Sequence, residues 1–176
     1  MAGVTGVMAL LHGLERVNRL LFVIAAWACL IMAVLGFAIV IARYGFSVGS
    51  IAAQELVMYL HAFVLLCAAA TTLACDGHVR VDIFYSRWPS QRRALVNLAG
   101  SLLLLMPVML FILVISWEYV AQAWARHETS AEAGGLAWVY LLKSLILLFA
   151  VQMLLQGVLQ AMRAWTEWRL QSEQGG

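Results

Sequence analysis

The sequence predicts an all-α integral membrane protein with four transmembrane helices and short interfacial amphipathic helices. Three observations support this prediction: the chain is 64% hydrophobic, only 11% of its 176 residues are charged, and long apolar runs fill most of its length. A soluble domain has roughly 25% charged residues, so this chain lacks the polar side chains needed to cover a water-facing surface. The net charge of +2 gives no reason to expect a nucleic-acid partner.

Four apolar runs are each long enough to cross a bilayer. About 20 residues of helix span the hydrocarbon layer, and the runs cover residues 20–42, 56–75, 94–117 and 136–162. The first three contain no charged residue, and the fourth contains only Lys143. The first run is too long for a signal peptide. Residues 1–176 are therefore predicted to form a single membrane domain.

Arginine is distributed unequally between the two sides of these spans. Eight arginines lie in the N-terminal segment, the second loop and the C-terminal tail, whereas only Arg43 and Arg126 lie in the other two loops. The eight are Arg16, Arg19, Arg80, Arg87, Arg92, Arg93, Arg163 and Arg169. Because cytoplasmic loops are enriched in Lys and Arg, both termini are predicted to be cytoplasmic.

Two shorter segments have the pattern of amphipathic helices at the membrane surface. In residues 4–18, apolar side chains follow helical spacing, and several polar side chains lie off that stripe. The off-stripe residues are Glu15, Arg16, Asn18 and Arg19. In residues 79–88, apolar positions repeat at i, i+3, i+4 and i+7, and Pro89 ends the segment. Residues 118–135 are expected to extend the third span outward and then turn.

His61 is the one histidine inside a predicted span. An intramembrane histidine can ligate haem or relay protons, but haem in a helical bundle usually needs a second histidine on a facing helix, and no other span contains one. The stripe that it shares has the spacing of a helix-packing seam, so a packing or polar contact is the preferred interpretation. That stripe comprises Gln54, Met58, His61, Leu65, Ala68, Thr72 and Cys75. The three cysteines lack metal or redox spacing, and no cofactor is predicted.

Several polar residues and a proline lie inside the third and fourth spans. Lys143 is predicted either to snorkel to the outer interface, which is preferred, or to pair with an acid of a partner or bind an anion. A row of glutamines at i, i+4 and i+8 is predicted to hydrogen-bond a neighbouring helix rather than to line a pore. The row is Gln152, Gln156 and Gln160. Pro107 is expected to kink the third span.

Charged residues crowd into the connection that follows the second span. Asp76, His78 and Asp82 suggest a metal site, but the spacing is loose, no fourth ligand is near, and Arg80 would oppose a cation. The preferred interpretation is a tight exit from a helix, in which Gly77 relieves crowding. Nothing in the sequence pairs a nucleophile with a base or forms a phosphate loop, so the protein is not predicted to be an enzyme.

The stretch "QELVMYLHAFVLLCAAATTLACDGHVRVDIFYSRWPSQRRALVNLAG" resembles the small membrane subunit of tripartite ATP-independent periplasmic (TRAP) transporters, the DctQ family. In that family an acid starts the second span, a "G-H-[IV]-x-V-D" signature follows it, and a basic cluster precedes the third span. The matching residues are Glu55, Gly77, His78, Val79, Val81, Asp82, Arg92 and Arg93. Residues 127–157 are similar to the branch labelled mannitol/chloroaromatic, although Ala137 and Leu147 stand where that branch usually has proline.

The resemblance implies an accessory role in a bacterial inner membrane. Such transporters combine a periplasmic binding protein, a large DctM-like membrane subunit and this small subunit, which widens the static scaffold during sodium-gradient-driven uptake of an organic acid. The candidate partner contacts are Glu55, Asp76, Gly77, His78, Arg80, Asp82 and Lys143, and the candidate docking residues for the binding protein are Glu128 and Glu132. The alternative is an assembly or regulatory four-helix subunit of an unrelated membrane complex.

Overall fold

The computed structural model describes residues 2–78 and 85–174, and most of these residues lie in helices. In chain order these are α1 (Ala2–Phe46), α2 (Ile51–Ala74), α4 (Ser90–Gly100), the π-helical turn η1 (Ser101–Leu105), α5 (Met106–Ala125) and α6 (Val139–Gln174). No strand occurs in the described ranges. Four helical stretches are long and apolar enough to cross a membrane: Arg16–Phe46, Ile51–Ala74, Ser90–Ala125 and Val139–Ser172. The predicted all-α membrane fold is confirmed.

The first helix is longer than its predicted span. Residues 4–18 are helical as expected, but no break separates them from the span, and α1 runs continuously for 45 residues. The structure therefore has one long helix here, and the surface location of its first part stays a prediction. The predicted helix at 79–88 falls largely outside the described residues, which resume at Tyr85 with a turn that ends before Pro89.

The second helix has defined ends that its sequence explains. The side chain of Ser50 caps the N-terminus by accepting a hydrogen bond from the backbone N–H of Ala53 at 3.3 Å. At the other end Asp76 adopts a left-handed conformation (φ 56°), and the N–H of Gly77 donates to the carbonyl of Thr72 at 2.8 Å. A Cβ on Gly77 would lie 3.2 Å from a side-chain carbon of Thr72, so a residue without a side chain relieves crowding at this tight exit.

The third span changes its winding just before Pro107. The helix from Ser90 to Ala125 contains the π-turn η1, in which the N–H of Met106 donates to the carbonyl of Ser101. Proline has no N–H and its ring crowds the carbonyl four residues earlier, here that of Leu103. A π-turn is one of the known ways in which a helix accommodates such a disturbance. The structure thus has a widened turn just before Pro107, and the kink that was expected there stays a prediction.

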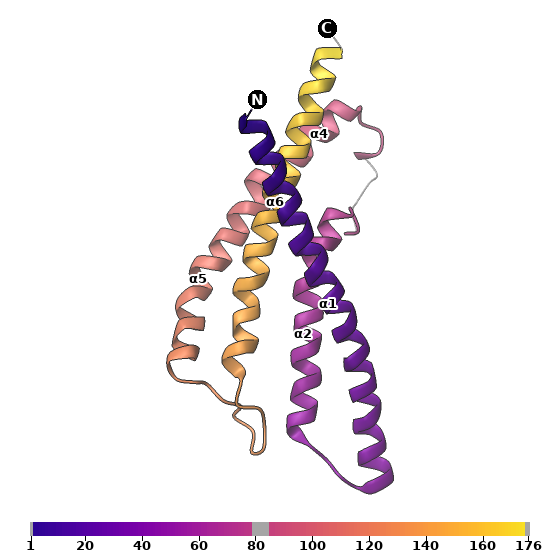
Figure 1. The fold of residues 1–176 in the computed structure, drawn as a ribbon, viewed down its shortest axis with the longest axis vertical. Coiled ribbons are helices and arrows are strands. Elements are labelled where there is room, and N and C mark those ends of the chain that lie inside the picture. Colours follow the sequence, from indigo (N-terminus) through magenta and orange to yellow (C-terminus); the bar gives the residue numbers. More distant parts are fainter. Residues whose placement is uncertain (1, 79–84, 175–176) are drawn as a thin grey trace.

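Helix α6 lies at the centre of the arrangement. It packs against α2, α4 and α5, whereas α1 packs mainly against α2. Figure 1 shows α2 and the second half of α1 on one side of α6 and α5 on the other, while the first part of α1 crosses α6 in this view. Both termini lie at the same end of the molecule. The buried core around Ala70, Met109 and Met153 joins α2, α5 and α6. Most of the other buried apolar residues are alanines, including Ala25, Ala123 and Ala150, whose small side chains let helices approach closely in a membrane.

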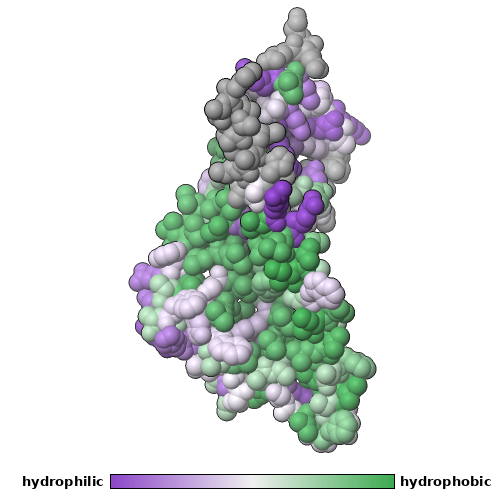
Figure 2. Space-filling view, in the orientation of Figure 1, coloured by the Kyte–Doolittle hydropathy of each residue, from purple (hydrophilic) through white to green (hydrophobic). Residues whose placement is uncertain are grey.

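The surface shows where a bilayer would lie. Figure 2 shows a broad hydrophobic band across the middle of the molecule, with hydrophilic residues gathered toward the end that carries the termini and beside the far end of α5. Large apolar side chains on α1 and α5 are strongly exposed, among them Phe37 (68%) and Phe111 (63%). Such exposure suits lipid rather than water, because lipid tails are as apolar as these side chains.

Candidate functional site

Polar contacts that join the helices occur along one face of α6. The side-chain amide of Gln152 donates to the backbone carbonyl of Leu66 on α2. One turn further along, Gln156 accepts a hydrogen bond from the side-chain amide of Asn18 on α1 at 3.1 Å. Gln152, Gln156 and Asn18 are 3%, 2% and 6% exposed. The prediction that the glutamine row hydrogen-bonds neighbouring helices is confirmed for these two glutamines.

Asn18 corrects one detail of the sequence analysis. It was expected on the polar, water-facing side of an amphipathic helix, but it is buried between α1 and α6. Its backbone carbonyl also accepts a hydrogen bond from the Thr71 hydroxyl at 3.3 Å. The expectation failed because helical spacing separates a polar face from an apolar face but does not distinguish water from another polar side chain as the neighbour. The glutamine row on the fourth span was the signal in the sequence that could have indicated this contact, because buried glutamines need polar partners such as Asn18.

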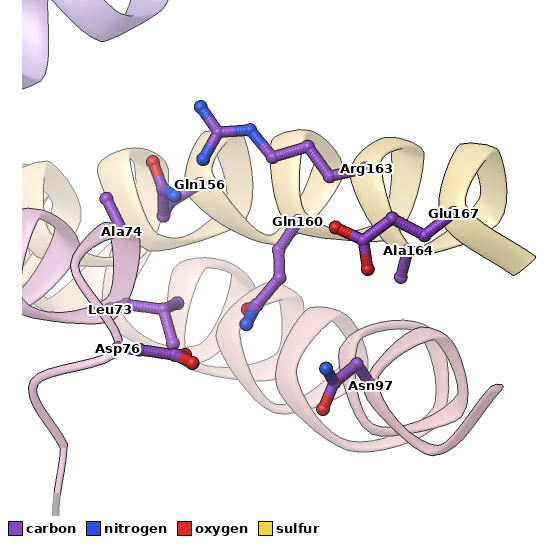
Figure 3. A pocket seen from close by; sticks show the side chains of 9 residues that line it. All are labelled: Leu73, Ala74, Asp76, Asn97, Gln156, Gln160, Arg163, Ala164 and Glu167. Atoms are coloured by element: carbon purple, nitrogen blue, oxygen red, sulfur yellow. The ribbon is translucent and has the colours of Figure 1, made fainter. Parts of the chain in front are cut away.

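The third glutamine of the row borders a polar cavity between the end of α2, α4 and α6. This termini-end cavity has a volume of about 170 Å³. Its lining residues are Leu73, Ala74, Asp76, Asn97, Gln156, Gln160, Arg163, Ala164 and Glu167. Figure 3 shows Gln160 extending from α6 toward Asp76 and Asn97, with Glu167 further along the same helix. Asn97 is held in place by Tyr85, whose hydroxyl hydrogen-bonds the Asn97 amide at 2.9–3.1 Å.

The described part of the family signature follows directly after a residue that lines this cavity. Asp76 and Gly77 form the exit from α2, and Asp76 lines the cavity. His78 follows and is exposed. Arg80 and Asp82 lie outside the described residues, so their predicted roles stay predictions. Within the described residues no group of three or more His, Cys, Asp or Glu side chains could hold a metal ion.

At the opposite end of the molecule Glu55 fastens the α5–α6 connection to α2. Its carboxylate accepts a hydrogen bond from the Ser130 hydroxyl and another, at 2.6 Å, from the backbone N–H of Leu136. The backbone N–H of Ser130 donates to the carbonyl of Leu136 at 2.9 Å, which closes the connection into a loop. A Cβ on Gly135 would lie 2.5 Å from the Ser130 hydroxyl and 2.8 Å from the Glu55 carboxylate, so only glycine fits there. These four residues form what we call the loop clasp.

Lys143 has a partner that the sequence did not reveal. Its ammonium lies 2.6 Å from the carboxylate of Glu128 and 4.0 Å from the centre of the Tyr119 ring. The lysine side chain is 15% exposed and the glutamate side chain 37%. Neither a free snorkelling lysine nor a pair with another subunit describes this arrangement. The α5–α6 connection folds back over the start of α6, and this return brings Glu128 to Lys143.

This ion pair also changes the expected docking surface. Of the two candidate docking residues, Glu128 is committed to Lys143, whereas Glu132 is exposed near the clasp. The backbone N–H of Glu132 donates to the Ser130 hydroxyl at 3.1 Å. Of these two candidates, Glu132 is therefore the one whose negative charge is not paired with Lys143.

His61 and its neighbours on α2 face away from the other helices of the chain. One side of α2 is exposed at four positions, Gln54, Met58, His61 and Leu65. The other side is buried at Cys67 and Ala70. We call these four exposed residues the α2 stripe. Along these four residues the predicted packing seam is therefore not covered by any helix that the structure describes.

In the part of the chain that the structure describes, several polar groups join helices or bind loops. Residues 32–167 match the family described as "Tripartite ATP-independent periplasmic transporters, DctQ component". The chain belongs to the DctQ family. It is thus the small membrane subunit of a TRAP transporter and a multi-pass inner-membrane protein, as the signature around Gly77 and His78 predicted. No curated protein matches the chain significantly in sequence.

Membership of this family places the residues above in a transporter component rather than in an enzyme. The family implies a tripartite system with a large DctM subunit and a binding protein. The match does not distinguish the mannitol/chloroaromatic branch, which stays a prediction. Three sets of contacts were not predicted from the sequence: the Asn18–Gln156 pair, the partners of Glu55, and the Lys143–Glu128 pair. All three join residues at least 15 positions apart.

Proposed function

We propose that this DctQ subunit is a static scaffold that supports the large membrane subunit during sodium-gradient-driven uptake of an organic acid delivered by a periplasmic binding protein. The observation that supports this role is that four polar residues within or beside the spans are paired inside the chain. Gln152, Gln156 and Asn18 bind other helices of the chain, and Glu55 binds a loop. A substrate or sodium site needs polar groups that converge on an open cavity, and groups already paired inside the bundle do not supply one.

The proposed membrane orientation has both termini in the cytoplasm. Figure 1 places the termini at one end and the α1–α2 and α5–α6 connections at the other, as four spans require. The arginine asymmetry supports a cytoplasmic location for the termini. Reporter fusions after Arg43 and Arg126 should show periplasmic activity, and fusions after Arg93 and Gly176 should not. The reverse pattern would refute this orientation.

The transport role is tested by reconstitution with and without the other two components. Vesicles that contain the small subunit alone should take up no organic acid under a sodium gradient. Uptake should require the large subunit and the binding protein together. Uptake by the small subunit alone would contradict a scaffold role. If the large subunit does not co-purify with this chain, the alternative of an assembly or regulatory subunit for an unrelated complex gains support.

Glu132 is proposed to take part in docking the binding protein. Surface charges at such a contact mainly set the encounter rate and are screened beyond about 8 Å at physiological salt. Glu132→Lys should therefore slow transport in the assembled system, and additional binding protein should partly restore the rate. Glu128→Lys would break the pair with Lys143 as well, so Glu132 is the cleaner position for this test.

A further inference from the structure

The α2 stripe places a polar ring near the centre of the membrane. Helix α2 has 24 residues and begins at Ile51, so it is about 36 Å long at 1.5 Å per residue. His61 lies ten residues from this start, or about 15 Å along the axis. The hydrocarbon core of a bilayer is about 30 Å thick. His61 is thus close to the bilayer midplane when α2 crosses the membrane.

The His61 ring has no hydrogen-bond partner among the residues that the structure describes, and it is exposed. Successive residues of a helix are rotated by about 100°, and this rotation puts the stripe opposite the buried residues Cys67 and Ala70. The ring therefore points away from α1 and α6, the two helices that pack on α2. In lipid its two ring nitrogens would find no partner, and an unpaired polar group in hydrocarbon is costly.

The hydrogen bonding of His61 differs from that of the buried amide side chains in this chain. The Asn18 amide donates to Gln156 and the Gln152 amide donates to a backbone carbonyl, so each of these side chains has a hydrogen bond inside the chain. Polar residues within spans usually face protein or a water-filled cavity rather than lipid. A histidine on the outside of the helix pair therefore indicates that another protein segment covers this face.

A groove at one end of the stripe indicates the chemistry of the covering segment. The groove has a volume of about 350 Å³ and is lined by Ile51, Gln54, Glu55, Met58 and Glu132. Glu55 and Glu132 give it negative charge, of which Glu55 is already hydrogen-bonded to the loop clasp. A second copy of this chain related by a two-fold axis along the membrane normal would bring equal negative charges together there. A different chain with a basic or hydrogen-bond-donating residue at this level is the better fit.

We infer that the α2 stripe is the docking face for a transmembrane helix of the large membrane subunit, with a polar side chain of that helix hydrogen-bonded to His61. This inference rests on the proposed function, because it takes the large subunit as the partner. It adds which face of which helix makes the contact, and it assigns His61 as the residue that positions the partner at the midplane.

Site-specific photocrosslinking in the co-expressed two-subunit complex tests the docking face. A photoreactive amino acid is placed at Met58 or Leu65 in the stripe and, as a matched control, at Phe111 or Val114 on α5. The control positions are 63% and 68% exposed, similar to Leu65 at 63%. The stripe positions should crosslink to the large subunit, and the α5 positions should give several-fold less product.

The outcomes separate the inference from the proposed function. If the two subunits co-purify but the stripe gives no more product than α5, the docking face is wrong while the scaffold role stands. A product of two copies of this 19.4 kDa chain from the stripe would identify a homodimer face and also overturn the inference. If the large subunit fails to co-purify at all, the proposed function fails first and the inference falls with it.

Substitution of His61 provides a second measurement. His61→Leu should weaken recovery of the complex by about 3- to 10-fold, the range expected for one interhelical hydrogen bond in a membrane. His61→Gln keeps hydrogen-bonding capacity and should restore most of the recovery. The melting temperature of the isolated subunit should not fall in His61→Leu, which separates lost docking from lost folding. Equal recovery of the complex with leucine and glutamine would contradict the role of His61.

Discussion

The buried pair between α1 and α6 allows a quantitative prediction. Gln156 and Asn18 are 2% and 6% exposed, and their side chains are joined by one hydrogen bond of 3.1 Å. We expect Gln156→Leu to destabilise the isolated subunit because it leaves the Asn18 amide buried without its partner. Glutamine and leucine are similar in size, so the term for a new cavity should be small.

Two ranges limit the expected magnitude. Leaving a buried donor unsatisfied costs about 1–3 kcal/mol in soluble proteins, whereas interhelical hydrogen bonds measured in a membrane protein average about 0.6 kcal/mol and reach about 1.7. The lower part of the first range overlaps the upper part of the second. Because both side chains are almost fully buried, we expect Gln156→Leu to lower the free energy of unfolding by about 1–1.7 kcal/mol. The double variant Asn18→Leu/Gln156→Leu should recover most of this loss, since neither polar group then remains.

The matched control is Gln152→Leu, on the same helix one turn away. Gln152 donates to the carbonyl of Leu66. Inside α2 this carbonyl also accepts the helical hydrogen bond from the N–H four residues later, so it keeps a partner when Gln152 is replaced. Its own amide oxygen is buried without a partner in the described structure, so replacing it removes an unsatisfied acceptor. Gln152→Leu should therefore be neutral or stabilising.

Equilibrium unfolding in mixed micelles measures these changes. The chain contains seven tryptophans, so intrinsic fluorescence can be followed alongside helical circular dichroism. Agreement between the two probes would support a two-state treatment. The reasoning is refuted if Gln156→Leu lies within about 0.3 kcal/mol of wild type, the usual limit of additivity. It is also refuted if the double variant is less stable than both single variants.

Three further predictions concern close contacts. Gly135→Ala should open the loop clasp and lower the melting temperature by several degrees, whereas Gly49→Ala, where a Cβ meets nothing within 4 Å, should not. Lys143→Met and Glu128→Gln should each lower the melting temperature of the isolated subunit, because each removes one partner of the ion pair. The exchanged pair Lys143→Glu/Glu128→Lys should recover part of the loss. An unchanged melting temperature in every variant would mean that the pair does not stabilise the subunit. Gly157→Val should destabilise the contact between α6 and η1, because a Cβ there already comes within 3.0 Å of a leucine side chain; unchanged thermal stability would contradict this close approach.

The sequence predicted the spans because lipid imposes a simple rule. Any segment that crosses hydrocarbon must satisfy its backbone internally and must be about 20 residues long, so apolar run length identifies the helices directly. The third predicted span, 94–117, lies inside the observed Ser90–Ala125, and the second, 56–75, extends one residue beyond Ala74. The boundaries differ most where a helix continues past the apolar run into polar sequence, as α1 does over residues 4–18.

The site residues were harder to predict because their roles depend on partners distant in sequence. Glu55 was selected from a family motif, but its clasp to Ser130 and Leu136 joins residues 75 and 81 positions apart. The pair between Lys143 and Glu128 depends on how one loop turns back. Helical periodicity predicts which residues share a face, and it correctly grouped the α2 stripe. It does not say what lies opposite that face.

Periodicity does not say what lies opposite a face, and for this reason the docking inference rests on His61 and not on the apolar surface. Three of the four spans have only 11% of their most apolar window buried, against 39% for the span in α6. In water such exposure would demand a partner, because burial of apolar surface drives association. In a membrane it does not, since lipid tails satisfy apolar side chains as well as another helix does. The exposed leucines and phenylalanines of α1 and α5 are therefore equally compatible with lipid and with protein. A polar ring near the midplane is compatible only with a surrounding that offers a hydrogen bond. Within the described residues no such surrounding meets His61, and this is the reason for proposing that another molecule supplies the contact.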